Sequence, residues 1–245
     1  MSKQPEMISV SVGQRDNSRA DKADKILAIL KDYLGDDLTR YTCLDVGCSA
    51  GAITHHLANK FRFTVGFDLD RLAIQEASAN FQRDILSFGI ANGALLPLSD
   101  SCVDVVICAQ VYEHAADQQS LADEIWRVLR PGGVCFFSGP NRLAVMEEHY
   151  WLPFLSWLPR PLANWYMRTT KKGNVYDINP LYYWQIQDLW RKFDRYDYTP
   201  IMIKFPSKFS LNETLGLHWV SRLPLQFLAV LAVFFPNYNW ILVKR

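Results

Sequence analysis

Residues 43–58, CLDVGCSAGAITHHLA, run from an apolar strand pattern through a glycine-containing turn into a helical pattern. Turns of this kind place free backbone N–H groups at the start of a helix, where they and the helix dipole favour phosphate. Here Asp45 precedes Gly47, the first glycine of the turn. A carboxylate opposes a phosphate and attracts a ligand with a cationic end. The turn therefore predicts a site that was not built for phosphate.

Outward from this turn, short apolar runs alternate with helical patterns, which is typical of a parallel sheet with helices on both faces. Strands are expected at residues 41–46, 63–68, 85–91, 103–109 and 134–139. Helices are expected from about residue 17 to a stop at 35–37, and at 52–60, 71–80 and 120–130. Further on, a helix is expected at 180–193, a strand at 195–205 that Pro200 confines to an edge or bulge, and a last strand at 239–245.

These patterns divide the chain into three parts. We expect a cofactor-binding core at 1–140, with an N-terminal helix from about residue 17, and a cap or substrate insertion at 141–179. The remainder, 180–245, holds a helix and the last strands, with an apolar helical insertion at 207–236.

The composition limits the classes of function. The chain has 245 residues, 49% of them hydrophobic, and a formal net charge of +1, which gives no electrostatic footprint for nucleic acid. Five cysteines occur without a CxxC pair, and the polar N-terminus lacks a secretory signal, so we expect buried thiols in a cytoplasmic protein. The apolar segment 223–236 is too short to span a bilayer, which needs about 20 residues, but is long enough to lie on one.

A second acid points to adenosine. Asp68 ends the second expected strand about 20 residues after the turn, where an acid hydrogen-bonds ribose hydroxyls. NAD enzymes share this feature, but an NAD-dependent oxidoreductase is disfavoured by Asp45 and by the missing GxGxxG. S-adenosylmethionine combines adenosine with a sulfonium and an ammonium group, and it suits both acids.

Four stretches occur in a set order, namely DVGCSAG (45–51), GFDLD (66–70), LPLSDSCVDVVICAQVYEH (96–114) and LRPGGVCFFSGPN (129–141). Together they resemble the class I S-adenosylmethionine-dependent methyltransferases, in the methyltransferase type 11-like group. The resemblance implies an α/β, Rossmann-like, doubly wound seven-stranded sheet, mostly parallel with an antiparallel last strand. Helical, aromatic-rich cap segments would be added to it. It also implies S-adenosyl-L-methionine as the cofactor.

The resemblance assigns roles at the glycine turn. Asp45, Gly47, Cys48 and Gly51 belong to the motif around the methionine end of the cofactor. Ser49 replaces the middle glycine of the fullest form of that motif, so the backbone is less free there.

It also assigns roles around the adenosine. Asp68 matches the ribose-binding acid, and Leu69 matches the apolar residue beside the adenine. Asn92, followed by Gly93, stands where the family usually has an acid that accepts from the adenine amino group, and an amide oxygen still accepts that bond. Gln110 lies where the family lines the cofactor pocket.

Methyl transfer to an oxygen of high pKa also needs a general base. The candidates are His114, His149, Glu113, Glu147 and Glu148, and we favour His149 or His114. No metal site is expected, because His55 and His56 are neighbours on a helix and point in different directions.

Residues after 140 are rich in tryptophan and tyrosine and are punctuated by Arg160, Arg168, Lys171 and Lys172. Part of this set would be core, and the rest would form a wall for sugars, isoprenoid chains or a membrane interface. Two roles are open for segment 223–236 and this aromatic cap. They would either bring a cytoplasmic protein into peripheral contact with a membrane or form a homodimer interface.

These observations favour O-methylation of a saccharide, a lipid-linked acceptor or another lipophilic small molecule. Carbon methylation of a quinone or other prenylated ring is the alternative within the enzyme class, and a non-catalytic cofactor-binding scaffold is the alternative outside it. Methylation of nucleic acid is disfavoured by the neutral charge.

Overall fold

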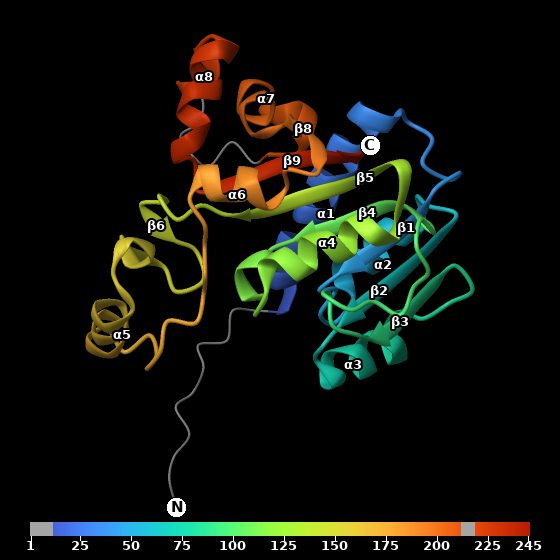
Figure 1. The fold of residues 1–245 in the computed structure, drawn as a ribbon, viewed down its shortest axis with the longest axis horizontal. Coiled ribbons are helices and arrows are strands. Elements are labelled where there is room, and N and C mark those ends of the chain that lie inside the picture. Colours follow the sequence, from blue (N-terminus) through green and yellow to red (C-terminus); the bar gives the residue numbers. More distant parts are fainter. Residues whose placement is uncertain (1–11, 212–218) are drawn as a thin grey trace, which may run out of the picture.

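A seven-stranded sheet forms the centre of the computed structural model, which describes residues 12–211 and 219–245 (Figure 1). Its strands are β1 (Thr42–Val46), β2 (Phe63–Asp68), β3 (Leu86–Ile90), β4 (Val103–Ala109), β5 (Leu129–Pro140), β8 (Phe193–Asp197) and β9 (Asn237–Lys244). Their order is β3-β2-β1-β4-β5-β9-β8. The pairs among β1 to β5 are parallel, whereas β9 runs antiparallel to both β5 and β8. The predicted fold class, including the antiparallel last strand, is therefore confirmed.

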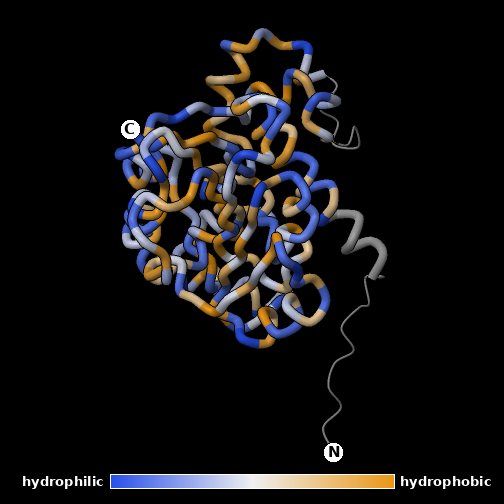
Figure 2. Tube along the Cα trace, turned by 90° about the vertical axis from the view of Figure 1, so that its right-hand side faces the viewer, coloured by the Kyte–Doolittle hydropathy of each residue, from blue (hydrophilic) through white to orange (hydrophobic). Residues whose placement is uncertain are grey.

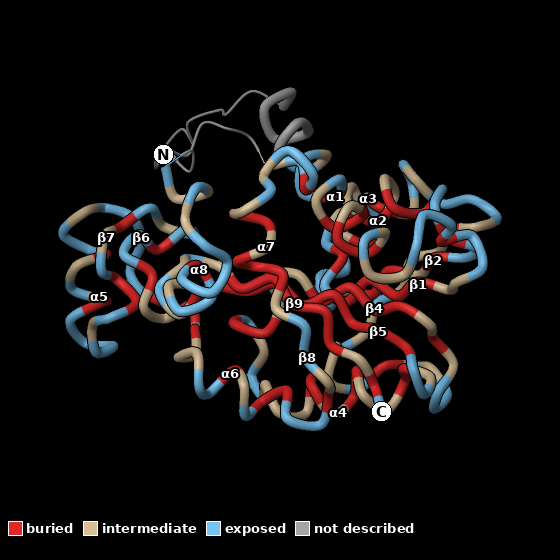
Figure 3. Tube along the Cα trace, turned by 90° about the horizontal axis from the view of Figure 1, so that it is seen from above, coloured by how far each residue is buried: buried red, intermediate tan, exposed pale blue. Residues whose placement is uncertain are grey.

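Helices cover both faces of this sheet. The helices beside the sheet are α1 (Val12–Leu34), α2 (Ala52–Ala58), α3 (Arg71–Phe81), α4 (Gln118–Val128), α6 (Tyr183–Leu189) and α7 (Thr199–Lys204). Two further helices lie outside these layers: α5 (Arg160–Thr169) belongs to the region 141–179, and α8 (Leu225–Leu231) packs on α7. Figure 3 shows the buried strands as a central layer, with α4 and α6 on one side and α1, α2 and α7 on the other. Within the described residues, no helix is both long enough and apolar enough to cross a bilayer.

Successive side chains of each strand point to opposite faces of the sheet, so each face has its own hydrophobic core. In β4, Val106 and Cys108 face the α4 and α6 side, while Val105 and Ile107 face the α1 side. All four of these side chains are fully buried. A strand covered on both faces reads as a continuous apolar run, which is why β4 was predicted with its observed bounds.

The segment after β8 corrects one prediction. The sequence predicted a strand over 195–205, but β8 ends at Asp197 and α7 begins at Thr199. Pro200 lies in the first turn of α7, where its missing N–H costs no hydrogen bond. β8 itself is an edge strand, as the sequence predicted.

The region 141–179 packs around a small core of its own. It contains the two-residue strands β6 (Met146–Glu147) and β7 (Leu152–Pro153), followed by α5. The residues of that core are Leu152, Leu155, Ala163, Met167, Tyr176 and Ile178. We call residues 141–179 the cap, and its role toward a substrate stays a prediction.

The predicted apolar insertion, 207–236, is mostly helical where the structure describes it. Short 3₁₀ turns flank α8, and part of the predicted helical pair, 212–218, lies outside the described residues. Figure 2 shows hydrophobic colour along the interior strands and also in the segment protruding at the top, where Figure 1 places α8.

Candidate functional site

A cavity of about 600 Å³ opens at the carboxyl ends of the parallel strands. The segments that follow β1, β2, β3 and β4 all line it, as expected for a ligand site in an open α/β sheet. Six of the predicted cofactor residues line it, namely Gly47, Asp68, Leu69, Asn92, Gly93 and Gln110. His114, one of the two predicted catalytic histidines, lines it as well.

The other predicted cofactor residues line a second cavity at the glycine turn. Asp45, Cys48 and Gly51 line a smaller neighbouring cavity of about 90 Å³, which Gly47 also lines. Arg19 of α1 reaches this smaller cavity too, and the sequence did not indicate that contact because α1 lies far from the turn in the chain.

Gly47 and Gly51 are needed for different reasons. Both adopt positive φ, 74° and 77°. A Cβ at Gly47 would lie 2.6 Å from Cγ2 of Val111, which lines the larger cavity, whereas a Cβ at Gly51 would lie 2.7 Å from the ring of Phe88. Gly47 therefore keeps the turn close to the end of β4, and Gly51 lets α2 pack close to β3.

Asp45 is buried under the turn. Its side chain accepts a hydrogen bond from the Thr54 hydroxyl at 2.6 Å. Burial raises the pKa of Asp45 to about 7, and the charge of nearby Asp68 adds to that rise, although the Thr54 bond opposes it. A cationic group beside Asp45 would therefore shift this carboxyl from a partly protonated to an ionised state.

Asp68 ties the turn to the end of β2. Its two carboxylate oxygens accept bonds from the backbone N–H of Ser49 at 2.8 Å and of Asp70 at 2.9 Å. Each oxygen keeps a further lone pair, so the carboxylate can accept bonds from a ligand at the same time.

Asn92 and Gln110 occupy the rim. The Asn92 side-chain oxygen accepts from the backbone N–H of Ala94 at 3.0 Å, so the oxygen predicted to receive the adenine amino group also closes its own loop. Gln110 has φ of 60° and donates from Nε2 to the side-chain oxygen of Asn237 at 3.1 Å. Asn237 in turn donates to Glu148 at 2.7 Å, which joins β4, β9 and the cap.

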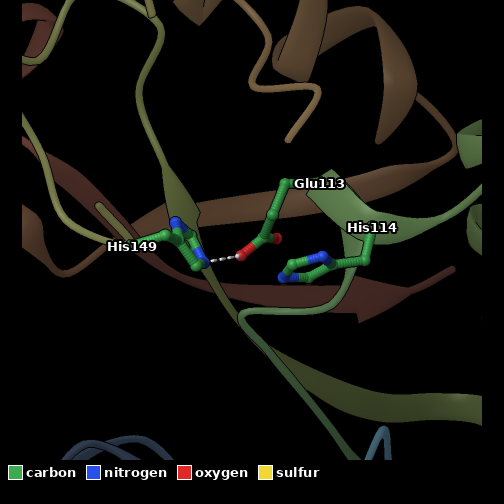
Figure 4. Close-up of side chains that lie close together, drawn as sticks. All are labelled: Glu113, His114 and His149. Carbon is green, nitrogen blue, oxygen red and sulfur yellow. Dashed lines mark ion pairs between the residues drawn. The ribbon is translucent and has the colours of Figure 1, made fainter. Parts of the chain in front are cut away.

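The two predicted catalytic histidines lie on either side of the Glu113 carboxylate, as Figure 4 shows, and His114 lines the cavity. The rings of His114 and His149 lie edge to face, with centroids 5.3 Å apart. His149 Nδ1 lies 2.8 Å from Glu147, and His149 Nε2 lies 3.7 Å from Glu113. Glu113 is completely buried, and neither of its carboxylate oxygens has a hydrogen-bond partner.

Glu113, His114 and His149 all have pKa values shifted by their surroundings. Burial raises the pKa of Glu113 to about 7. The hydrogen bond to Glu147 raises the pKa of His149, whereas burial lowers the pKa of His114. From the sequence, Glu113 and Glu147 are candidates that stand below the histidines, because burial is not visible in a sequence.

The cap presents apolar side chains outward. Phe154, Leu162 and Trp165 are exposed and line an apolar hollow of about 340 Å³ on its surface. Arg168, Lys171 and Lys172 are exposed nearby in sequence. Arg160 donates to the Tyr176 carbonyl and to the Asn179 side chain, so it links parts of the cap.

Comparison with known proteins gives a consistent result. Residues 44–137 match the family model described as "Methyltransferase domain". A probable S-adenosylmethionine-dependent methyltransferase of Mycolicibacterium smegmatis is 41% identical over 100 residues, which cover 41% of this chain and 38% of that protein. A ubiquinone biosynthesis O-methyltransferase of Rickettsia conorii is 25% identical over 183 residues, covering 68% of this chain and 62% of that protein.

The chain thus spans less than two thirds of the length of either relative. A crystal structure from Listeria monocytogenes, described as a "putative S-adenosylmethionine dependent methyltransferase", shares the fold with a TM-score of 0.58 at 15% identity. The alignment covers 91% of this chain and 98% of that one.

Proposed function

We propose that this chain, whose residues 44–137 form a class I S-adenosylmethionine-dependent methyltransferase domain, transfers a methyl group from S-adenosylmethionine to an oxygen of a lipophilic small molecule. One observation carries the proposal: the cavity lined by the ribose-binding candidate Asp68 is also lined by His114, beside the buried acids. A cofactor and an acceptor bound there would share one enclosure.

The cavity fits this cofactor chemically. Asp68, Asp70 and Asp117 line it, and among the described residues no lysine or arginine does. An acidic lining suits a ligand with a sulfonium and an ammonium group and is unsuited to a pyrophosphate. The close approach of Gly47 to Val111 leaves no room for a side chain at position 47.

When bound, S-adenosylmethionine supplies an electrophilic methyl group on its sulfonium. Asp68 would hold the ribose hydroxyls through the lone pairs that Ser49 and Asp70 leave free. His114, at the cavity wall, would take the proton of an acceptor hydroxyl at a ring nitrogen. His149, oriented by Glu147, stands in contact with His114.

Transfer to oxygen is favoured over transfer to carbon by two observations. The imidazole of His114 lines the cavity, where an oxygen acceptor needs a base. One relative is named for O-methylation in ubiquinone biosynthesis. Carbon methylation of a quinone or prenylated ring remains the second candidate, and a non-catalytic scaffold the third.

The surface supports a lipophilic acceptor reached at a membrane. Phe227 and Val230 on α8, and Phe234 in the turn after it, are exposed by 55%, 68% and 62%. The aromatic and basic side chains of the cap give the mixture typical of a membrane interface. We take this surface to contact lipid, with a homodimer as the competing outcome of the test given in the Discussion.

Calorimetric titration of the full chain with S-adenosylmethionine and with NAD tests the cofactor. We expect binding of the methyl donor alone, and at least tenfold weaker binding in Asp68→Ala, because each 1.4 kcal/mol lost is a factor of ten. Transfer of labelled methyl to quinols and to lipid-linked sugars then tests the acceptor class. A folded protein that does not bind the donor would leave a vacant scaffold, and binding without transfer to any acceptor would favour the non-catalytic candidate.

A further inference from the structure

We propose that Glu113, His114 and His149 bind a divalent transition-metal cation. Each offers one ligand atom, and these atoms all lie within 4.8 Å of one another (Figure 4). Zinc and its first-row neighbours bind imidazole nitrogen and carboxylate oxygen. Tetrahedral ligands about 2.0–2.2 Å from the ion stand roughly 3.4 Å apart, so small side-chain rotations would bring these three to an ion.

The first argument is the state of Glu113. The side chain is completely buried, and neither oxygen has a hydrogen-bond partner. Buried carboxylates are otherwise paired, hydrogen-bonded or coordinated to a metal. Among the described residues, only His149 lies within ion-pair distance of Glu113. The distance from His149 Nε2 to Glu113 Oε1 is 3.7 Å, which is too long for a hydrogen bond.

The second argument is the orientation of His149. Its Nδ1 lies 2.8 Å from Glu147, and the other oxygen of Glu147 accepts from the backbone N–H of Tyr150 at 2.8 Å. A neutral imidazole that donates from Nδ1 presents a lone pair at Nε2, which here faces Glu113. Metal-binding histidines characteristically donate their second N–H to a carboxylate in this way.

The third argument is the position of His114. It completes the set of ligands and also lines the 600 Å³ cavity, so an ion held here would stand at the cavity edge. Three protein ligands leave at least one position open. On the proposed function, that position would hold an oxygen of the acceptor, and the histidines would then act on the acceptor through the ion.

The sequence predicted no metal site, because the adjacent pair His55 and His56 cannot readily hold one ion. The ligands proposed here come from two separate segments. Glu113 and His114 follow β4, whereas His149 belongs to the cap. Only the packing of the cap against the end of β4 brings them together.

The test uses the full chain, titrated with Co²⁺ and followed by visible absorption, and with Zn²⁺ followed by calorimetry. We expect one equivalent to bind, and the affinity to fall at least tenfold in Glu113→Gln and in His149→Ala. Glu147→Gln, which removes only the partner of His149, should lower affinity by about 10- to 100-fold. His56→Ala is the control, because His56 is ion-paired with Asp24 on the protein surface.

Circular dichroism checks that each variant is folded. Absence of stoichiometric binding, or binding weakened by His56→Ala and not by the three cluster variants, would overturn the proposal. Calorimetry with S-adenosylmethionine on the same proteins keeps the two proposals apart. A chain that binds metal but no methyl donor would refute the proposed function alone, and the reverse result would refute the metal site alone.

Discussion

A Cβ atom added at Gly47 would lie 2.6 Å from Cγ2 of Val111, which is closer than non-bonded carbon atoms approach one another in folded proteins. The two residues follow neighbouring strands, β1 and β4, and both line the 600 Å³ cavity. The glycine turn is thus fixed in place by the end of β4, and that contact is made at the wall of this cavity.

Replacing Gly47 with alanine should therefore damage both stability and cofactor binding. Gly132 is a matched control, because its φ of 76° is close to the 74° of Gly47 while nothing lies within 4 Å of its added Cβ. Gly132→Ala should lower the free energy of unfolding by about 1–2 kcal/mol through backbone strain alone. Gly47→Ala should cost about 1–3 kcal/mol more through overpacking.

Denaturant unfolding and titration with S-adenosylmethionine measure the two effects. We expect at least tenfold weaker binding in Gly47→Ala, and partial recovery when Val111→Ala is added. Equal stability losses at Gly47 and Gly132 would show that strain, and not the contact with Val111, decides the effect.

Asp45 predicts a link between cofactor binding and protons. Burial raises its pKa from the ordinary value of 3.8 to about 7 in the folded chain. The folded chain therefore holds a proton that the unfolded chain has lost between about pH 4 and pH 7. As the pH rises through that window, the free energy of unfolding should fall relative to that of Asp45→Asn, because the unfolded state binds fewer protons than the folded state there.

A cation bound near Asp45 would lower its pKa, so binding of S-adenosylmethionine at pH 7 should release protons. Calorimetry in buffers with different ionisation enthalpies counts them. Release should be smaller in Asp45→Asn than in the unmodified chain. The same count in both proteins would place the cationic end of the cofactor away from this carboxyl.

The elements of the core were largely predictable from sequence, for a physical reason. β2 and β4 are buried runs bounded by turn residues, and they were predicted with their observed bounds. The region 195–205 was misread because its apolar residues suit a strand, whereas Thr199 and Pro200 begin a helix. The sequence predicts a strand that Pro200 confines to an edge or a bulge, whereas Pro200 lies in the first turn of α7.

The site was predictable only in part. Glycines and acids at strand ends were found because the turn and the sheet edge follow from local pattern, and Gly47 and Asp68 do line one cavity. The burial of Glu113 was not visible, and neither was the contact of His149 with His114, because both depend on how the cap packs on β4.

The exposed apolar side chains of α8 predict binding to lipid. Phe227→Ser combined with Val230→Ser should weaken sedimentation with anionic phospholipid vesicles at least tenfold, because both side chains are exposed by more than half. Leu72→Ser, at a residue exposed by 75% on α3, is the control. Added salt should also weaken vesicle binding if Lys171 and Lys172 contribute.

Sedimentation velocity on the same proteins examines the competing outcome. A chain that is dimeric without lipid, and that becomes monomeric in the α8 variant without any change in vesicle binding, would assign this surface to a second copy of the chain.

The Tyr112 hydroxyl anchors the segment that carries Glu113 and His114. Its buried hydroxyl donates to the Pro140 carbonyl at 2.5 Å and accepts from the backbone N–H of Leu181 at 3.1 Å. Tyr112→Phe leaves both groups without this partner and should lower the free energy of unfolding by about 1–3 kcal/mol. Tyr150→Phe, which removes an exposed bond to Asp177, should cost less.

Because Tyr112 directly precedes Glu113 and His114, its loss should also loosen the cluster beside the cavity. Hydrogen exchange of the residues after β4 measures this loosening, and denaturant unfolding measures the stability. If Tyr112→Phe and Tyr150→Phe lose equal stability and exchange remains unchanged, then packing of the aromatic ring, and not its hydroxyl, holds this segment against the end of β5.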